Sequence, residues 1–459
     1  MQPTSIRLLA AALGAHVEDE TMISAVYTDS RAVTKGSLFV CIEGERFDGH
    51  RFAGKALEQG AAYVVASKPL QLPAEKVFYV PNTLDAHIAL SRAYREQFHP
   101  LTVGITGSVG KTTAKDFTAC VLGVRWRTHK TEGNHNNEIG LPQTLFQLDG
   151  SEQALAAEMG MDKPGDIDKL ASAVQPDAAI LTFIGTAHIE KLGSRENILR
   201  AKLEVTRHLA DGAPLIVNAD CDLLAAYTDR RLRVIRYGLD ALDADYRAGE
   251  IAAGEDGTHF VIRHGEERTP VFIPAVGRHN VSDALAAFAA GCELGLSGQE
   301  AAEGLRRYEP SGMRQRMVRL GGVTVVEDCY NASPDSMRAA LRTLQELPAA
   351  GRRAAVLGDM LELGETAAEA HREIGRCCAE NGIDRLYGFG PQAALTVEAA
   401  QAAGMREAEH FTSKQALTAR LAQETGEGDV LWVKASRGMR FEEILEELYR
   451  VLKEKGAED

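Results

Sequence analysis

A glycine loop, Gly104-Ile-Thr-Gly107-Ser-Val-Gly110-Lys111-Thr112, carries the clearest chemistry in this chain. An apolar run precedes the loop and a helix-forming run follows it, which predicts a strand, a loop and a helix. Backbone N–H groups of such a loop surround a phosphate, and the helix N-terminus adds a favourable partial charge. Lys111 would reach the terminal phosphates and Thr112 would ligate Mg2+. The predicted nucleotide site consists of Gly107, Ser108, Val109, Gly110, Lys111, Thr112 and Thr113.

The loop is a shortened form of the usual phosphate-binding pattern, because Ile105 stands where that pattern has a further glycine. The short form, G-x-x-G-K-T, is the narrower signature. A chance Gly-Lys-Thr turn is the alternative, but chance rarely supplies the flanking strand and helix as well.

Two further side chains follow predicted strands of the same region. Glu158 closes an apolar stretch, where a carboxylate is unfavourable unless it is paired or binds a metal. His188 comes directly after a predicted strand, and open α/β sheets bind ligands at strand C-termini. A lone histidine there is more often an ordinary loop residue, but Glu158 and the phosphate loop favour a site. By residue type alone, Lys202 on the next predicted helix is a solvent-facing lysine.

Polar groups later in the chain suit the other parts of a nucleotide. Asn280 begins a small-residue helix, where it could cap the helix or bind a base edge. Asp328 ends a predicted strand and could hold ribose hydroxyls, while Arg314 could neutralise phosphate charge. A capped surface turn is the alternative for Asp328. The amide-rich segment around Asn136 and Asn137 is either a solvated turn or a loop that binds a polar substrate.

These residues need a scaffold of parallel strands, and the alternation of strands and helices supplies one. The strands predicted between residues 100 and 310 span 101–105, 178–184, 214–217 and 234–237, with an antiparallel segment over 246–273. The strands predicted after 310 span 323–328, 354–357, 385–389 and 430–433, followed by a charged amphipathic helix over 442–455. The elements predicted before residue 98 are helices over 5–13 and 52–59 and strands over 37–42, 62–65 and 77–80.

The expected fold class is therefore α/β with three domains. Residues 1–98 form a smaller N-terminal α/β domain, and residues 99–310 form a central P-loop-type parallel sheet with helices on both faces. Residues 311–459 form a C-terminal Rossmann-like domain, and a hinge is expected at the joint near Pro310.

Composition limits the function classes. The 459 residues are 45% hydrophobic and 25% charged, as in ordinary soluble proteins. A net charge of -14 without a basic block argues against a nucleic-acid partner. No apolar run approaches the ~20 residues of a membrane span, and the first residues lack a signal pattern. Seven scattered cysteines without metal spacing fit a reducing cytoplasm.

Taken together, these motifs resemble those of the Mur ligases of peptidoglycan synthesis. The resemblance covers nearly the whole chain. The segments that carry it are the phosphate loop, Asn136-Asn137-x-Ile-Gly-x-Pro, Glu158-Met-Gly-Met, Ala187-His188, Gly-Arg-His-Asn280, Asp328-x-Tyr330-Asn331-Ala, Gly-Asp-Met360-x-Glu-Leu-Gly364, Val433-Lys-Ala-Ser-Arg437, Thr28-Asp-Ser30-Arg31 and Phe47-Asp48-Gly-His50.

The resemblance implies a role for each candidate residue. ATP is implied as cofactor, with two Mg2+ ions near Thr112, Glu158, His188 and Lys202, the lysine being carbamylated by CO2. Lys111, Glu158, His188 and Lys202 are the implied catalytic residues. Asn280 would contact adenine, Arg314 phosphate and Asp328 ribose, with the choice between Arg314 and Arg316 open. The implied contacts to the UDP substrate are Ser30, Arg31, Asp48, His50, Asn136 and Asn137. Strand-end positions suggest Asn331, Lys434 and Arg437 for the incoming dipeptide.

Within the family, the motifs look like those of the dipeptide-adding enzyme. The implied reaction joins D-alanyl-D-alanine to UDP-MurNAc-tripeptide through an acyl phosphate and forms ADP. The sequence lacks the Asp-Asn-Pro-Arg motif of the diaminopimelate-adding relative, and the third residue of the peptide stays open between diaminopimelate and lysine. A sister ligase adding one amino acid is the main alternative. Folylpolyglutamate synthase would leave the N-terminal domain unexplained, and a non-catalytic switch would not need Glu158, His188 and Lys202. A monomer is expected.

Overall fold

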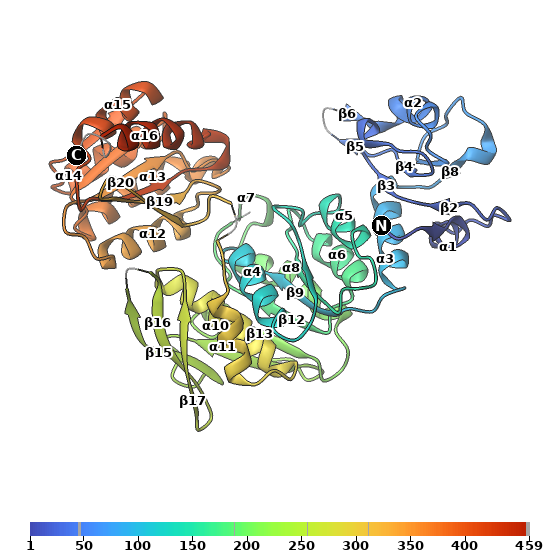
Figure 1. Ribbon diagram of the computed structural model, residues 1–459, viewed down its shortest axis with the longest axis horizontal. Helices are drawn as coiled ribbons and strands as arrows, with labels where there is room; N and C mark the ends of the chain where they lie inside the picture. The colour runs from blue at the N-terminus through green and yellow to red at the C-terminus, as the bar shows by residue number, and fades with distance from the viewer. Residues whose placement is uncertain (45–46, 188, 255, 311, 456–459) are drawn as a thin grey trace.

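The computed structural model describes residues 1–44, 47–187, 189–254, 256–310 and 312–455, which form three lobes (Figure 1). The N-terminal lobe, in blue, and the C-terminal lobe, in orange and red, both stand above a central lobe. Each lobe contains a sheet covered by helices, which confirms the predicted three-domain α/β class. The exact domain boundaries stay predictions.

The N-terminal lobe is built on a four-stranded parallel sheet among the described residues, in the order β3-β4-β7-β8. The three strands predicted here are present, each within two residues of its expected ends. The strands are β1 Thr4–Ser5, β2 Met22–Ile23, β3 Val26–Tyr27, β4 Leu38–Val40, β5 Glu43–Gly44, β6 Phe47–Asp48, β7 Tyr63–Ala66 and β8 Val77–Tyr79, and the helices are α1 Ile6–Ala12, α2 Ala53–Glu58 and α3 Thr83–Arg95.

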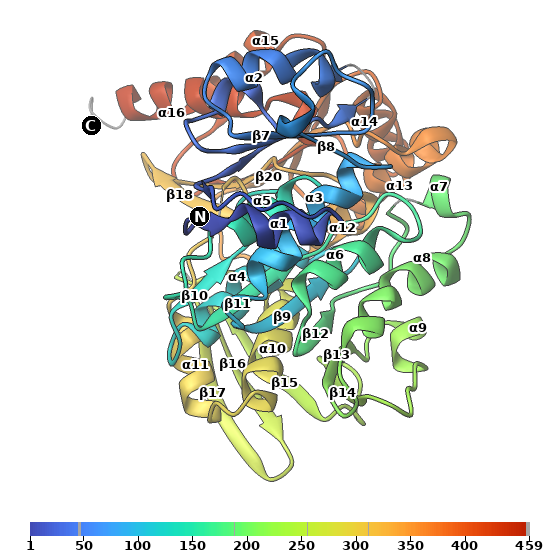
Figure 2. The same cartoon turned by 90° about the vertical axis from the view of Figure 1, so that its right-hand side faces the viewer.

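Helix α3 ties this lobe to the central one. It packs against α5 (Gly140–Phe146) and α6 (Asp166–Val174) of the central lobe, as Figure 2 also shows. Ile88 and Tyr94 of α3 belong to the same buried cluster as Leu141 and Leu145 of α5. Burying apolar area across the boundary fastens the two lobes to each other.

The central sheet has nine strands among the described residues, in the order β10-β11-β9-β12-β13-β14-β15-β16-β17. It is parallel up to β15 and antiparallel from β15 to β17, so the expected antiparallel segment continues the same sheet. The strands are β9 Leu101–Thr106, β10 Thr128–Lys130, β11 Ala154–Glu158, β12 Ala178–Leu181, β13 Pro214–Asn218, β14 Arg233–Gly238, β15 Tyr246–Ala253, β16 Thr258–His264 and β17 Glu267–Ile273.

Helices cover both faces of the central sheet, as predicted. Successive residues of a strand point to opposite faces, and in β11 Leu155 packs with α5 and α6 while Ala156 packs with α4 and α10. The helices not yet given are α4 Lys111–Leu122, α7 Ile189–Leu192, α8 Arg195–Lys202, α9 Asp222–Ala225, α10 Arg278–Glu293 and α11 Gly298–Arg306.

The C-terminal lobe holds a six-stranded sheet among the described residues, in the order β18-β19-β23-β20-β21-β22, with only β18 antiparallel. Helices α12 and α13 cover one face and α15 and α16 the other. The strands are β18 Arg316–Leu320, β19 Val323–Asp328, β20 Arg353–Gly358, β21 Arg385–Phe389, β22 Ala408–Phe411 and β23 Val430–Lys434, and the helices are α12 Pro334–Glu346, α13 Ala367–Glu380, α14 Ala393–Ala402, α15 Lys414–Glu424 and α16 Glu442–Lys455.

None of the described helices is long and apolar enough to cross a membrane. The edge strands β3, β10, β18 and β22 were not predicted, and β11 was expected only as the apolar stretch that Glu158 closes. β10 and β22 are short and contain polar residues. The strand predicted over 178–184 ends at Leu181, which leaves 182–187 as a loop beside the phosphate loop.

Candidate active site

The phosphate loop runs from the end of β9 to the start of α4, as predicted. Gly110 caps the helix in the left-handed conformation, with φ of 83°, and a Cβ there would overlap the Asp283 carboxylate. The loop backbone is held by the loop that follows β12, since Ser108 N–H donates to Phe183 O at 2.7 Å. Lys111 Nζ folds back to Gly107 O at 2.9 Å. The loop is thus preorganised, and Lys111 lies over it.

Glu158 meets the phosphate loop because β11 lies directly beside β9. Thr112 Oγ1 donates to Glu158 Oε2 at 2.8 Å, and Asn136 Nδ2 donates to Glu158 Oε1 at 2.7 Å. Thr112 and Glu158 are both buried. A hydroxyl and a carboxylate at the end of a phosphate loop are the oxygen donors that Mg2+ prefers, so these residues fit the implied ion. His188, the other expected ligand, lies outside the described residues.

Lys202, the last residue of α8, is only 1% exposed, so its interpretation as a surface lysine is wrong. Ile198 and Ala201 are buried on the same helix, and Lys202 enters the interior with them. Burial lowers the pKa of Lys202 well below its ordinary value, and the positive charge of Lys111 lowers it further. The side chain therefore favours a neutral amine near the phosphate loop.

The two candidate arginines of the joint have different partners. Arg316 is held by Glu327 through Nε and Nη2, both at 2.9 Å. Arg314 stacks on the Tyr330 ring with its guanidinium carbon 3.9 Å from the centroid. Burial lowers the pKa of Lys111, Glu158 opposes that effect, and Arg314 adds to it. Arg314 is therefore the arginine whose charge reaches the phosphate loop.

The nucleoside candidates Asn280 and Asp328 lie on opposite sides of the joint between the central and C-terminal lobes. Asn280, at the start of α10, donates through Nδ2 to Val276 O at 2.7 Å and to Gln315 Oε1 at 2.6 Å. Asp328 Oδ2 accepts from Lys434 Nζ at 2.7 Å, because β19 and β23 are neighbours and pair these two residues. Lys434, expected at the dipeptide, thus lies in the Asp328 cluster.

The N-terminal candidates form a hydrogen-bonded chain. Asp48 Oδ1 lies 2.6 Å from His50 Nδ1, and Ser67 N–H donates to His50 Nε2 at 3.0 Å. Hydrogen bonds from Lys68 and His50 hold the pKa of Asp48 well below its usual range. Both His50 nitrogens are engaged, so this residue supports the loop around it. The preceding candidates lie in a short 3-10 turn, Ser30–Ala32, where Ser30 is buried and Arg31 pairs with Asp29.

Three other expected contacts have partners outside the phosphate loop. Asn137 Oδ1 accepts from the N–H groups of Ile139 and Gly140 at the start of α5, which leaves Asn136 as the amide on Glu158. Arg437 is half-exposed and pairs with Glu442 at 3.0 Å. Asn331, the third expected dipeptide contact, accepts Lys434 Nζ through its backbone oxygen.

Two polar residues of the site, one of them buried, were not predicted. Asp283 stands one helical turn after Asn280 and lies against Gly110, and burial raises its pKa well above the ordinary value. The spacing of three residues on one helix was a signal that could have found it. Gln315 gave no such signal, because its importance depends on the joint between two lobes.

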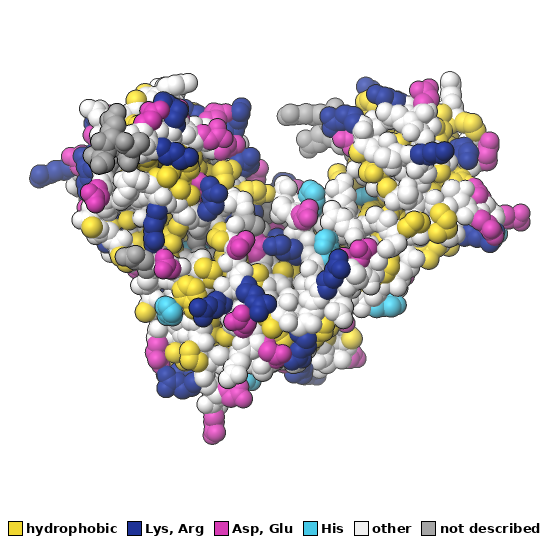
Figure 3. Space-filling view, viewed as in Figure 1, with side chains coloured by type: hydrophobic (Ala, Val, Ile, Leu, Met, Phe, Trp, Pro, Cys, Tyr) yellow, Lys and Arg dark blue, Asp and Glu magenta, His cyan; other side chains and the backbone are white. Residues whose placement is uncertain are grey.

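Figure 3 shows a notch between the N- and C-terminal lobes, with the central lobe as its floor.

This three-lobed fold, with a phosphate loop facing a joint, defines a class of ATP-dependent ligases. Family models match almost the entire chain: the Mur ligase middle domain over 105–291, the Mur ligase glutamate ligase domain over 313–437 and the Mur ligase family catalytic domain over 22–105. The chain belongs to the Mur ligase family.

Individual relatives are more specific. The chain is 40% identical over 435 residues to the UDP-N-acetylmuramoyl-tripeptide--D-alanyl-D-alanine ligase of Bacillus subtilis. This alignment covers 94% of each of the two chains. It superposes on MurF from Acinetobacter baumannii with a TM-score of 0.90 at 28% identity, covering 98% of this chain and 99% of that one. MurF ligase from Thermotoga maritima in complex with ADP gives a TM-score of 0.86 at 29% identity, covering 94% and 98%. The resemblance to Mur ligases is thus confirmed.

Proposed function

We propose that this chain joins D-alanyl-D-alanine to UDP-MurNAc-tripeptide and converts ATP to ADP and phosphate. The observation that carries the proposal is the contact of Thr112 with Glu158 beside a phosphate loop that the C-terminal lobe approaches, since Gly185 lies against both Ser108 and Asp335. The 40% identity to the B. subtilis enzyme over most of both chains supports the dipeptide as acceptor.

The chemistry has to make a carboxylate electrophilic. A substrate carboxylate oxygen attacks the γ-phosphorus and ADP leaves, which gives an acyl phosphate. The dipeptide amine then attacks the acyl carbon, phosphate leaves with the former carboxylate oxygen, and the amine loses a proton. Enzymes of this kind act mainly by positioning the reactants and neutralising charge.

Residues from two lobes would neutralise that charge. Lys111 lies over the loop that would hold the phosphates, and Arg314 brings a positive charge from the C-terminal side. Thr112 and Glu158 would hold Mg2+, which would shield the phosphates and the substrate carboxylate from each other. His188 is proposed as a further ligand, with two ions in all. Burial raises the pKa of Asp283 well above its ordinary value, which disfavours a further negative charge beside the loop.

Lys202 is proposed to be carbamylated. A neutral lysine amine adds to CO2, a nitrogen–carbon bond forms and a proton is released. The product is a carbamate, whose two oxygens act like those of a carboxylate. A buried lysine near the phosphate loop is suited to this reaction because burial favours the neutral amine. The modification would replace the positive charge of Lys202, which Lys111 repels, by a negatively charged group that can bind a metal ion.

Other contacts are assigned to the remaining candidates. Asn280 is proposed for adenine and Asp328 for ribose, with Lys434 holding the Asp328 carboxylate in place. Contacts to the UDP substrate are assigned to Ser30, Arg31 and Asp48. The remaining candidates for the same substrate are His50, Asn136 and Asn137. Asn331 and Arg437 are proposed for the dipeptide. We propose that the protein acts as a cytoplasmic monomer.

Phosphate release tests this function. The chain is incubated with ATP, Mg2+ and UDP-MurNAc-tripeptide, and either D-Ala-D-Ala or single amino acids are supplied. Release with the dipeptide alone, together with a pentapeptide product by mass, is expected. Release with a single amino acid would assign the chain to a sister ligase. No release with any acceptor would favour a nucleotide switch, and a Lys111→Ala variant with full activity would contradict the mechanism.

A further inference from the structure

Gln315 lies at the joint between the central and C-terminal lobes in an uncommon backbone conformation. Its φ is 54°, in the left-handed region that residues other than glycine rarely adopt. The next residue, Arg316, begins β18 and is held by Glu327. Strained conformations of this kind persist only where surrounding contacts hold them.

The side-chain amide of Gln315 makes such contacts with the start of α10. Its Oε1 accepts from Asn280 Nδ2 at 2.6 Å and lies 2.8 Å from His279 Nε2. Asn280 is 3% exposed, and its Nδ2 also donates to Val276 O at 2.7 Å. Both hydrogens of the Asn280 amide are therefore used within the protein, one of them by a residue from across the joint.

Adenine would need one of these hydrogens. An asparagine amide binds adenine with two hydrogen bonds, since Oδ1 accepts from the exocyclic amine and Nδ2 donates to the ring N7. The Val276 bond lies within the turn that leads into α10, whereas the Gln315 bond comes from the C-terminal side. Adenine and Gln315 therefore compete for the same donor.

We propose that Gln315 is a latch of the joint, which adenine displaces from Asn280 so that nucleotide binding releases the C-terminal lobe. The inference rests on the proposed adenine role of Asn280. The displaced amide has room to move, because Gln315 lines a cavity of about 410 Å3 shared by the two lobes. Residues that line it from both sides include Pro274, Ala275, Pro310 and Met317. Gln315 is thus a positioning residue that acts through Asn280.

The test is calorimetric titration of ADP into the full-length chain and its variants. Gln315→Ala removes the competitor, and we expect ADP to bind about fivefold more tightly, the worth of one neutral hydrogen bond. Gln315→Glu keeps an oxygen that accepts from Asn280, so wild-type affinity should return. In assays of turnover, the KM for ATP should fall by the same factor in Gln315→Ala while kcat stays within about twofold.

The outcomes separate the latch from its alternatives. Weaker ADP binding by Gln315→Ala would make Gln315 an adenine contact, and unchanged binding would make it a structural residue; each result overturns the latch. If the alanine variant unfolds, Gln315→Gly keeps the left-handed backbone without strain and must show the same tightening. Asn280→Ala tests the proposed function separately, because unchanged ADP binding there would remove adenine from Asn280 whatever Gln315 does.

Discussion

At the scale of single residues, the geometry distinguishes side chains that the sequence leaves equivalent. Arg314 and Arg316 stand two positions apart, yet one stacks on Tyr330 near the phosphate loop and the other is held by Glu327. Lys202 looked like a surface lysine and is buried. Residue type and spacing identified the phosphate loop, but burial and partners are set by the fold.

Exchanging each arginine for alanine should separate their roles. Arg314→Ala should lower kcat/KM for ATP by roughly 100-fold, because a charge near the transferring phosphate is lost. Arg316→Ala is the matched control, and its kcat/KM should change by less than about threefold. Steady-state kinetics with ATP as the varied substrate measures both. Equal losses in the two variants would contradict the assignment of Arg314.

The carbamate on Lys202 predicts a spectroscopic signal. Protein equilibrated with 13C-bicarbonate and Mg2+ should show one carbamate carbon resonance in its 13C NMR spectrum. That resonance should be absent from Lys202→Ala and present in Lys111→Ala, which keeps the buried amine. Activity should also fall when CO2 is removed and return when bicarbonate is added. A spectrum without the resonance at full activity would disprove the modification.

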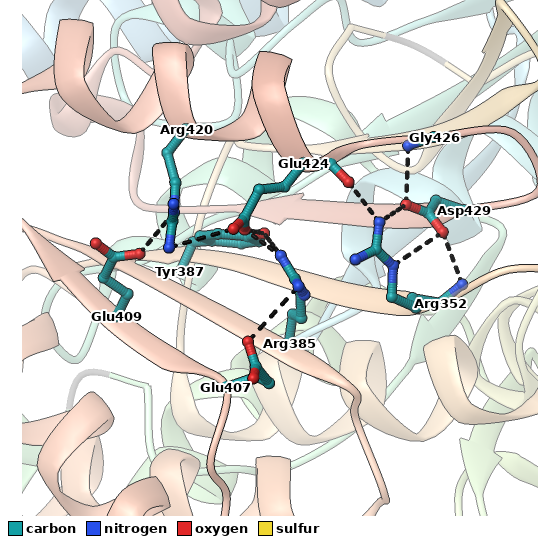
Figure 4. Close-up of polar contacts among 9 residues, drawn as sticks. All are labelled: Arg352, Arg385, Tyr387, Glu407, Glu409, Arg420, Glu424, Gly426 and Asp429. Carbon is teal, nitrogen blue, oxygen red and sulfur yellow. Dashed lines mark hydrogen bonds and ion pairs between the residues drawn. The ribbon is translucent and has the colours of Figure 1, made fainter.

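At the scale of elements, the strand ends of the C-terminal sheet carry candidate site residues, and its strand starts carry structural ion pairs. Asp328 and Lys434 end β19 and β23, whereas Asp429 and Arg385 stand at strand starts. Figure 4 shows the starting edge, where Glu424 of α15 contacts Arg385 and Tyr387 of β21, and Arg352 pairs with Asp429 at 2.9 Å. These pairs fix α15 and β23 to the sheet.

The Asp429 pair predicts a pH-dependent loss of stability. Burial raises the pKa of Asp429, but hydrogen bonds from Arg352 and the backbone of Gly426 outweigh it, and the net pKa is lowered. A lowered carboxyl pKa stabilises the fold above the unfolded-state pKa, and that contribution is lost as the pH falls through the folded-state pKa. Asp429→Asn should therefore lower the free energy of unfolding by about 2 kcal/mol at pH 7, after allowing for the partial exposure of Arg352.

Urea unfolding at several pH values measures this effect. The difference between wild type and Asp429→Asn should begin to shrink as the pH falls below about 4, where the Asp429 carboxyl of the unfolded chain takes up its proton, and it should vanish below the lowered folded-state pKa. Arg450→Ala is a control, because its ion pairs lie on the exposed side of α16 and should add nothing measurable. A difference that stays constant from pH 7 to pH 3 would contradict the ionic origin.

Sequence patterns predicted the central elements better than the edges. Buried parallel strands such as β9 and β21 are continuous apolar runs, so they were placed within a residue or two. The edge strands β10, β18 and β22 were missed because polar or charged residues interrupt their apolar pattern. The phosphate loop is local in sequence and was predicted, whereas the contact of Asn280 with Gln315 depends on two lobes meeting and has no local pattern.

At the scale of the whole molecule, the two outer lobes are attached differently. The N-terminal lobe shares a buried cluster with the central lobe through α3, which favours a fixed attachment. The C-terminal lobe shares only Val276 of the central lobe with its buried cluster, and it approaches the loop after β12, where a Cβ at Gly185 would lie 2.6 Å from Asp335 Oδ2. Movement on ligand binding is therefore expected at the 310 joint.

A larger side chain at Gly185 should obstruct that movement. Gly185→Val would push against Asp335 of α12 and should lower kcat about tenfold or more. Gly249→Val is the control, because nothing lies within 4 Å of a Cβ at that position. Small-angle scattering with and without ligands should show contraction in wild type and in the control only. Identical curves for wild type in both states would contradict closure.

Transfer of oxygen from substrate to phosphate tests the central claim most directly. UDP-MurNAc-tripeptide labelled with 18O in the carboxylate that reacts is turned over with ATP and D-Ala-D-Ala, and the released phosphate is analysed by mass spectrometry. An acyl phosphate keeps one former carboxylate oxygen on phosphorus, so one 18O per turnover should appear in the phosphate. Phosphate without the label, formed along with the pentapeptide, would contradict the proposed reaction.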